Sequence, residues 1–155
     1  MPRKSRNYTR VLEPDPKYKS VLAAQFINYI MLHGKKSVAR EIFYDCMELV
    51  EKETGKDAMT SFNAAIKNVA PMVEVKSRRV GGANYQVPIE VRAERRISLA
   101  FRWILDAAKK KKGRAMHQKL ATEIIDAYNK AGSVIKKKED THRMAEANRA
   151  FAHLR

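Results

Sequence analysis

The chain has 155 residues, about the size of one domain, and 45% of them are apolar. Its formal net charge is +15, from 32 Lys and Arg against 17 Asp and Glu, an excess that repels itself unless a polyanion neutralises it. The single cysteine, Cys46, excludes an intrachain disulfide, and no apolar run is long enough for a membrane span. The basic N-terminus lacks the apolar segment of a secretory signal. These features favour a nucleic-acid-binding protein of the cytoplasm or of an organelle.

The positive charge is concentrated in two regions of the sequence. Residues 1–40 carry nine Lys and Arg against two acids, and residues 72–119 carry thirteen against four. Between them, residues 41–71 carry three against six, and residues 120–155 carry seven against five. This distribution predicts a basic binding face and an ordinary solvated face on one molecule.

The first part of the chain predicts a basic arm followed by three helices. Residues 1–19 contain three prolines and no helical period, so we expect them to form a basic N-terminal extension. A first helix should begin after Ser20 and end before Gly34, and a second should run from about Ser37 to Thr54. A third should follow Asp57 and end before Pro71.

The hydrophobic period then changes from 3.6 to 2, which predicts a β-hairpin over about residues 72–91. Gly81 and Gly82 supply the positive φ angles of a tight turn. A lone two-stranded ribbon is marginally stable, so we expect its base to pack on the helices while its tip projects.

Three more helices are predicted after the hairpin. The fourth covers about Arg92 to Lys110, the fifth begins near Met116 and ends at Gly132, and the sixth begins near Ser133 and leads into a basic C-terminal tail. No linker divides the chain. The sequence therefore predicts a mainly α, bundle-like single domain over residues 20–155, with six helices and a protruding two-stranded hairpin.

The strongest chemical signal is a basic cluster at the hairpin and the start of the fourth helix. Arg92, Arg95 and Arg96 share one helix face by their i, i+3 and i+4 spacing, and the preceding strand carries Lys76 and Arg78. Guanidinium forks bind phosphate oxygens bidentately, and few acids stand nearby in the sequence. The cluster therefore predicts contact with a folded RNA backbone.

Further basic residues stand at helix ends and in the arm, where phosphate groups can approach. Lys35 and Lys36 precede a helix N-terminus, whose free N–H groups favour anions. The full set of predicted RNA-binding residues comprises Arg3, Lys4, Arg6, Arg10, Lys35, Lys36, Lys76, Arg78, Arg92, Arg95, Arg96, Lys109, Lys110, Lys111, Lys112, Arg114 and Lys119.

Catalysis and metal binding find little support in the sequence. The four histidines match no zinc-binding spacing, and Cys46 lies mid-helix, where a buried inert thiol is expected. Trp103 and Phe101 are expected to fill the core, whereas Tyr85, near the hairpin tip, is the better candidate for base stacking. We therefore expect no catalytic residue, no cofactor, no metal and no small-molecule substrate.

Two other classes of function remain open at this point. The first two helices could form a DNA-binding helix-turn-helix, although the second carries acids at Glu41, Asp45, Glu48 and Glu51, which would face phosphates. A free RNA-modifying enzyme would need a cofactor loop or an acid/base pair, and the sequence offers neither.

Three segments together resemble one known family. They are Pro14–Tyr18 leading to Gly34–Ala39, then Val73–Pro88, and finally His142–His153. Over almost its whole length the chain is similar to the bacterial-type small-subunit ribosomal protein seven family. The resemblance implies a structural protein of the ribosome that binds the 3′ major domain of small-subunit ribosomal RNA and nucleates assembly of the subunit head.

The same resemblance implies neighbours within the ribosome. These are the exit-site tRNA, the nearby mRNA, and small-subunit ribosomal proteins nine and eleven. The residues expected near the exit-site tRNA are Arg79, Gly81, Gly82, Asn84, Tyr85, Arg143 and Arg149.

Overall fold

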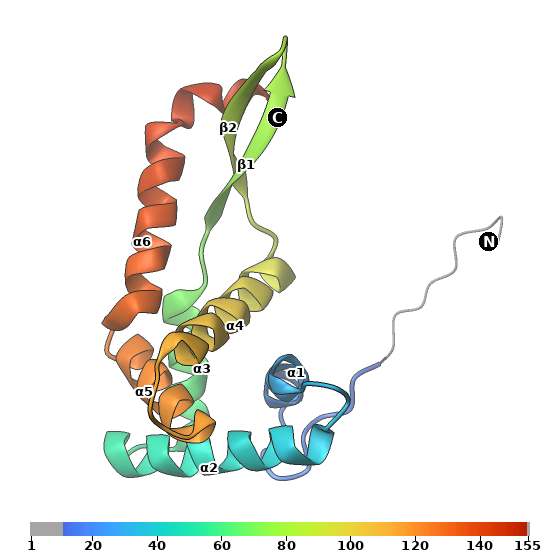
Figure 1. Cartoon of the computed structure of the whole chain (residues 1–155), viewed down its shortest axis with the longest axis vertical. Helices are drawn as coiled ribbons and strands as arrows, with labels where there is room; N and C mark the ends of the chain where they lie inside the picture. The colour runs from blue at the N-terminus through green and yellow to red at the C-terminus, as the bar shows by residue number, and fades with distance from the viewer. Residues whose placement is uncertain (1–10, 155) are drawn as a thin grey trace, which may run out of the picture.

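The computed structural model describes residues 11–154 and confirms the mainly helical fold (Figure 1). The elements follow in the order α1 (Val21–Ile30), α2 (Lys36–Thr54), α3 (Ala58–Val69), β1 (Val73–Val80), β2 (Ala83–Glu90), α4 (Ala93–Lys110), α5 (Met116–Tyr128), α6 (Gly132–Ala147) and the 3-10 helix η1 (Arg149–Leu154). Within residues 11–154, every helix is too short or too polar to cross a membrane.

Local side-chain chemistry explains where the first helices begin and end. The Ser20 hydroxyl accepts the N–H of Ala23 at 3.4 Å, and the Asp57 carboxylate accepts the N–H of Thr60 at 2.8 Å. Each bond satisfies an N–H group that has no partner within its helix. Bonds to Thr60 also lower the pKa of Asp57. At the other end of α2, Gly55 adopts a φ of 64°, which favours glycine.

The core lies among α1 to α5, with Val134 and Ile135 from the start of α6, in the lower part of Figure 1. Phe26, Phe43, Phe62 and Phe101, from four different helices, are all at most 1% exposed. Their contacting ring pairs have centroids between 4.9 and 6.5 Å apart, the spacing at which aromatic rings attract one another. We call α1 to α5 the body.

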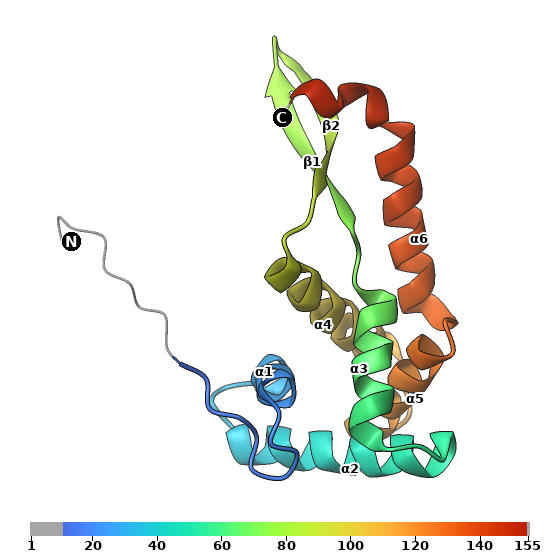
Figure 2. The same cartoon turned by 180° about the vertical axis from the view of Figure 1, so that it is seen from behind.

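The hairpin and α6 leave the body side by side (Figures 1 and 2). The strands pair from Val73 opposite Glu90 to Val80 opposite Ala83, and Gly81 and Gly82 form the turn with φ angles of 57° and 89°. Beyond α6, η1 folds back against β2, where the Phe151 and Tyr85 rings lie 5.2 Å apart. The hairpin projects as predicted, and the predicted C-terminal tail forms an additional support for β2 beyond its base.

Residues 11–19 belong to the predicted N-terminal extension, but part of this segment packs against α2. Asp15 is 3% exposed and accepts the N–H groups of Lys17 and Tyr18 and the hydroxyl of Tyr44. The Lys17 ammonium lies 3.0 Å from the Glu48 carboxylate of α2. Residues 1–10 lie outside the described residues, and the boundary of the arm at residue 19 stays a prediction.

Candidate nucleic-acid interface

The hairpin base brings Arg95, Lys76 and Glu74 together. Arg95 lies in the first turn of α4, and its guanidinium points at β1. Its Nε and Nη2 donate to the Glu74 carboxylate at 3.0 and 2.8 Å. The Lys76 ammonium lies 3.2 Å from the same carboxylate. The Glu74 side chain is 13% exposed, whereas those of Arg95 and Lys76 are about half exposed. One carboxylate therefore holds two cations at the surface.

Arg96 lies beside this group and is held by the end of β2. Its Nε donates to the carbonyl oxygen of Val91 at 2.8 Å, and its Nη2 lies 3.4 Å from the Glu90 carboxylate. Arg92 is exposed at the N-cap position of α4. The three arginines of the predicted face thus surround the junction between the hairpin and α4.

The expectation that acids are few near this cluster is wrong. Glu74 and Glu90 stand at opposite ends of the hairpin sequence, but the antiparallel register returns both to its base, next to the first turn of α4. Hydrogen bonds from Arg95 lower the pKa of Glu74 and so favour its charged form. Arg95 and Arg96 therefore brace the fold in addition to any role toward RNA.

The hairpin tip carries the residues predicted near the exit-site tRNA. Arg79, Gly81, Gly82 and Asn84 are all exposed at the end of the ribbon. Tyr85, predicted as a stacking residue, is instead half-buried against Phe151. A ring with an intramolecular partner has less free face for a base.

Arg143 of α6 and Arg149 of η1 are also predicted near the exit-site tRNA, and each is paired with an acid of α6. The Arg143 guanidinium lies 3.5 Å from Asp140, and that of Arg149 lies 3.4 Å from Glu146. Both arginine side chains are about four-fifths exposed, so these i, i+3 pairs are weak and can open to a phosphate.

Lys35 and Lys36 lie exposed where α2 begins. His33 and Gly34 take φ angles of 52° and 74° and turn the chain sharply from α1 into α2. Lys35 occupies the N-cap position without a side-chain bond to the helix, and the first turn contains no acid. The positive end of the α2 dipole is therefore surrounded by cations, an arrangement that attracts anions.

The lysine run at the end of α4 divides into two kinds of residue. Lys109, Lys110, Lys112 and Arg114 are exposed. Lys111, however, lies 2.7 Å from the carboxylate of Glu123, a residue of α5 that is only 2% exposed. Lys111 therefore neutralises a nearly buried acid, a partnership that no local pattern in the sequence indicates.

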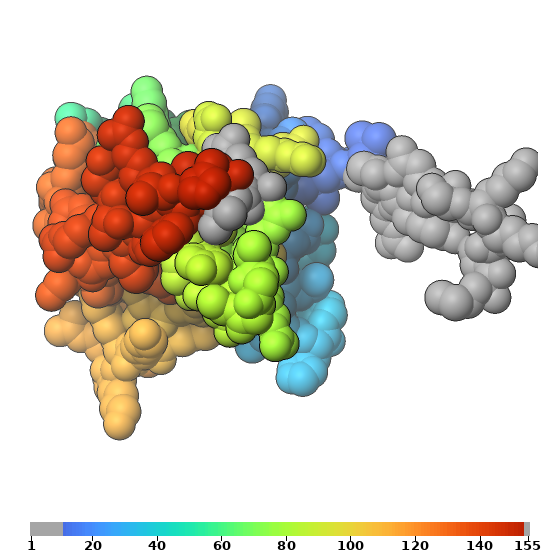
Figure 3. Space-filling model, turned by 90° about the horizontal axis from the view of Figure 1, so that it is seen from above, coloured from blue at the N-terminus to red at the C-terminus, as the bar shows by residue number. Residues whose placement is uncertain are grey.

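The structure brings several of the predicted groups to one side of the molecule. In Figure 3 the hairpin points toward the viewer and lies in the lower half of the view, as do the turn before α2 and the loop after α4. Lys119, on α5, is half-buried. Arg3, Lys4, Arg6 and Arg10 lie outside the described residues.

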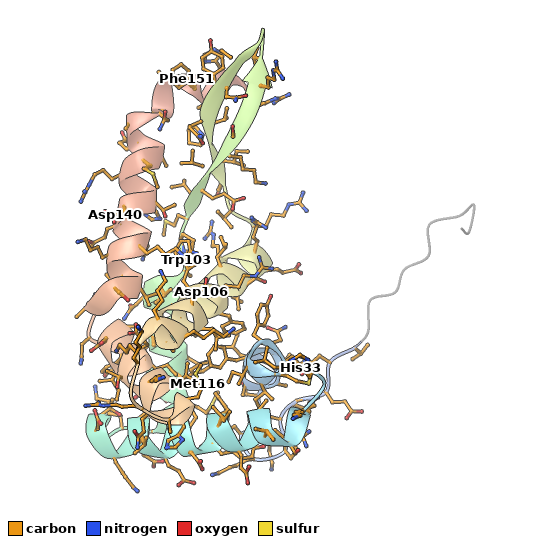
Figure 4. The ribbon with its side chains drawn as sticks, viewed as in Figure 1. His33, Trp103, Asp106, Met116, Asp140 and Phe151 are labelled. Carbon is orange, nitrogen blue, oxygen red and sulfur yellow. The ribbon has the colours of Figure 1, made fainter. Side chains whose placement is uncertain are left out.

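The sequence interpretation missed an accessible tryptophan. Phe101 fills the core as expected, but Trp103 is only partly buried, and the Lys137 ammonium lies 5.3 Å from its ring centroid. Figure 4 places Trp103 on α4, facing the region of α6. The signal available in the sequence was the two-residue step from Phe101, which turns a helical side chain well away from the core.

The catalytic alternatives gain nothing from the geometry. Cys46 is fully buried, and this burial raises the pKa of its thiol far above the ordinary value. Among residues 11–154, no three His, Cys, Asp or Glu side chains gather in a way that could hold a metal ion. Asp45, Glu48 and Glu51 are exposed along α2, the acidic surface expected from the sequence.

Comparison with known proteins identifies the family of the chain. Residues 2–149 match the family described as ribosomal protein S7p/S5e. The small ribosomal subunit protein uS7 of Bordetella pertussis is 56% identical over 155 residues, which are all of this chain and 99% of that protein. The namesake from Thermotoga maritima is 56% identical over 153 residues, 99% of each chain, and that from Clostridium botulinum is 54% identical over 155 residues. The chain therefore belongs to the ribosomal protein S7p/S5e family and is a structural constituent of the small ribosomal subunit, not an enzyme.

Proposed function

We propose that this protein binds the 3′ major domain of the small-subunit ribosomal RNA directly and thereby nucleates assembly of the subunit head. A protein of the small subunit acts in the cytoplasm, within the ribosome. The observation that carries the proposal is that three basic segments lie on one side of the molecule: the hairpin, the start of α2 and the loop after α4 (Figure 3). A rigid body with cations at three separated points can hold a folded RNA in one orientation.

Each segment offers a different kind of phosphate contact. At the start of α2, free backbone N–H groups of the helix lie next to the ammonium groups of Lys35 and Lys36. The loop after α4 offers flexible ammonium groups from Lys109, Lys110 and Lys112. At the hairpin base, the Glu74 carboxylate fixes one edge of the Arg95 guanidinium and leaves Nη1 for a phosphate oxygen.

The exit-site neighbours are the second part of the proposal. The tip of the hairpin, Arg79 to Asn84, is exposed and makes no part of the core. Such a projecting ribbon can reach exit-site tRNA and mRNA while the body stays on ribosomal RNA. We place ribosomal proteins nine and eleven next to this chain on the family resemblance alone.

A salt titration tests the RNA contact. If about six to ten phosphates are contacted, raising the salt from about 50 to 200 mM should weaken binding to isolated 3′ major-domain RNA by about 10³–10⁵-fold. Replacing Lys35, Lys36 and Lys112 with alanine should reduce both the affinity and the salt slope, whereas Lys52→Ala on the acidic face of α2 should change neither. A flat titration, or equal losses from both sets, would contradict the proposed face.

A shortened hairpin separates the two parts of the proposal. Replacing Arg79–Asn84 with an Asn-Gly turn keeps the contact between Tyr85 and Phe151. We expect filter binding to head-domain RNA to weaken only modestly, and retention of exit-site tRNA on reconstituted subunits to fall. Complete loss of RNA binding in a folded variant would make the hairpin the main anchor and overturn this division.

A further inference from the structure

A groove of about 360 Å³ lies between α4 and α6, outside every predicted binding residue except Lys110. Trp103 and Ala107 of α4 and Val134 and Met144 of α6 give it an apolar lining. Figure 4 places Trp103 and Asp106 on α4 and Asp140 across from them on α6. The volume is sufficient for one nucleotide base and its sugar.

The face of Trp103 is covered by a replaceable group. The Lys137 ammonium lies 5.3 Å from the ring centroid, and Lys137 is an exposed residue. Such a cation–π contact at an exposed site is worth about 0.5–1 kcal/mol, so the lysine can leave the ring at small cost. Tyr85, in contrast, packs against another aromatic ring, and Phe101 is buried. Of these three aromatic side chains, Trp103 is therefore the one best placed to receive a base from outside.

The rim of the groove carries lysines on both sides and a carboxylate next to Trp103. Lys110, Lys136 and Lys137 stand on its two sides, where a phosphate backbone would pass. Asp106 follows Trp103 by three positions on α4, so both side chains share a face of the helix. Within the part of the chain that the structure describes, the Asp106 carboxylate forms no hydrogen bond or ion pair. The other carboxylate of the groove, that of Asp140, already lies 3.5 Å from Arg143.

We propose that this groove receives one unpaired nucleotide of the ribosomal RNA, with guanine the base that fits it best. The base stacks on Trp103, and its N1–H and N2–H groups donate to the Asp106 carboxylate. Lys137 moves from the indole ring to the phosphate of the same nucleotide. A carboxylate on an RNA-binding surface repels the backbone, and it is favourable there when it accepts hydrogen bonds from a base edge. The inference rests on the proposed binding of ribosomal RNA and adds a site that reads one base.

The protein contains one tryptophan, so its fluorescence reports on this groove alone. Titrating the full chain with 3′ major-domain RNA should quench Trp103 with the same midpoint as filter binding. A control chain with Trp103→Phe and Tyr128→Trp places the only indole on α5 and should show little quenching at the same RNA concentration. Among hexanucleotide probes, UUUGUU should quench Trp103 at lower concentration than UUUUUU.

Variants separate stacking and base recognition from charge. Trp103→Leu should weaken binding of the domain RNA by about 5- to 150-fold, the effect of removing one base–aromatic stack, whereas Trp103→Phe should lose much less. Asp106→Asn should also weaken binding, although it removes a negative charge. The matched control Asp45→Asn, on the acidic face of α2, should leave affinity unchanged or slightly higher. Because Asp106 is exposed, its variant keeps the test valid even if Trp103→Leu fails to fold.

The possible failures are distinguishable. Normal RNA binding without a change in Trp103 fluorescence, or tighter binding by Asp106→Asn, would overturn the nucleotide site and leave the proposed function intact. Quenching that appears only when other small-subunit proteins are added would assign the groove to a protein and also overturn it. Failure of the unaltered chain to bind the domain RNA would instead contradict the proposed function itself.

Discussion

The body and the hairpin lobe are stabilised in different ways. The body contains the aromatic core of Phe26, Phe43, Phe62 and Phe101. The hairpin lobe comprises β1, β2, α6 and η1. Apart from Val134 and Ile135 at the start of α6, the buried apolar residues of these elements within the described chain are Val87 and Ala145. Separate contacts hold it together: Arg95 with Glu74, the Met72 N–H with His142, and Tyr85 with Phe151. Burial of apolar side chains therefore determines the stability of the body, whereas a few polar and aromatic pairs determine the orientation of the hairpin lobe.

Removing an aromatic ring from the body should produce the largest change. Phe62 contacts three other rings and is fully buried, so Phe62→Ala should lower the free energy of unfolding by about 3–5 kcal/mol. Urea denaturation followed by circular dichroism measures this loss. Phe151→Ala is the matched change in the hairpin lobe and should cost far less. Similar losses from both variants would remove the distinction between the two regions.

A smaller loss of stability is expected at Lys111, whose ammonium neutralises the nearly buried Glu123 of the body. Lys111→Met leaves Glu123 in a nearly buried position without its ammonium partner, so the free energy of unfolding should fall by about 1–3 kcal/mol. The nearby Asp126 carboxylate, 3.8 Å from Lys111, adds to the imbalance. Adding Glu123→Gln should restore most of the stability in the same denaturation experiment.

Lys112 supplies the control for this prediction. It is the exposed neighbour, so Lys112→Met should leave stability within about 0.5 kcal/mol and reduce RNA affinity. If Lys111→Met and Lys112→Met had the same effect on unfolding, the Glu123 pair would have no structural role.

The hairpin lobe should respond to Glu74→Gln in a way that charge alone does not predict. The variant removes a negative charge from the RNA-binding side, which by itself would tighten binding. It also weakens the hydrogen bonds that fix the direction of Arg95, because an amide offers one neutral acceptor oxygen where the carboxylate offers two charged ones. We expect this loss to dominate and weaken affinity roughly two- to fivefold. Filter binding decides the sign, with Glu90→Gln, whose pair with Arg96 is longer and more exposed, as the control.

The smallest expected effect is the loss of the hydrogen bond between His142 and Met72 at acidic pH. The Nε2 of His142 accepts the Met72 N–H at 3.1 Å, which requires a neutral ring, and burial together with Lys138 lowers the pKa of His142. The contact therefore stabilises fully above the unfolded pKa near 6.5 and is lost progressively as the pH falls toward the lower folded value. Amide exchange at Met72 should accelerate in this range, after correction for the intrinsic rate, while amides of α2 should not. His142→Phe should abolish this pH dependence, and its persistence would point to another group.

The body was the more predictable region because its signals are local. Ser20, Asp57 and Gly55 mark helix ends through bonds to adjacent residues, and the apolar faces repeat every turn. The two-residue turn at Gly81 and Gly82 followed from the same kind of reasoning. In these places a few neighbouring residues determine the backbone.

The interactions that the sequence did not predict join residues far apart along the chain. Arg95 and Glu74, or Lys111 and Glu123, look like solvated charges until the fold places them together. The burial of Tyr85 depends on Phe151, which a sparsely apolar segment gave no reason to assign to a packed structure. The three basic segments were each predicted, but their position on one side of the molecule required the arrangement of α2, the hairpin and α4 in space.

The contact between Tyr85 and Phe151 also affects the order of events during synthesis. At about 5–20 residues per second, several seconds separate the translation of these two residues. During that interval β1 and β2 have emerged without the segment that later covers Tyr85, and their edges are open to pairing with other chains. A nascent chain that stalls before Phe151 therefore exposes an unsupported ribbon on an otherwise folding protein, a species suited to recognition by chaperones.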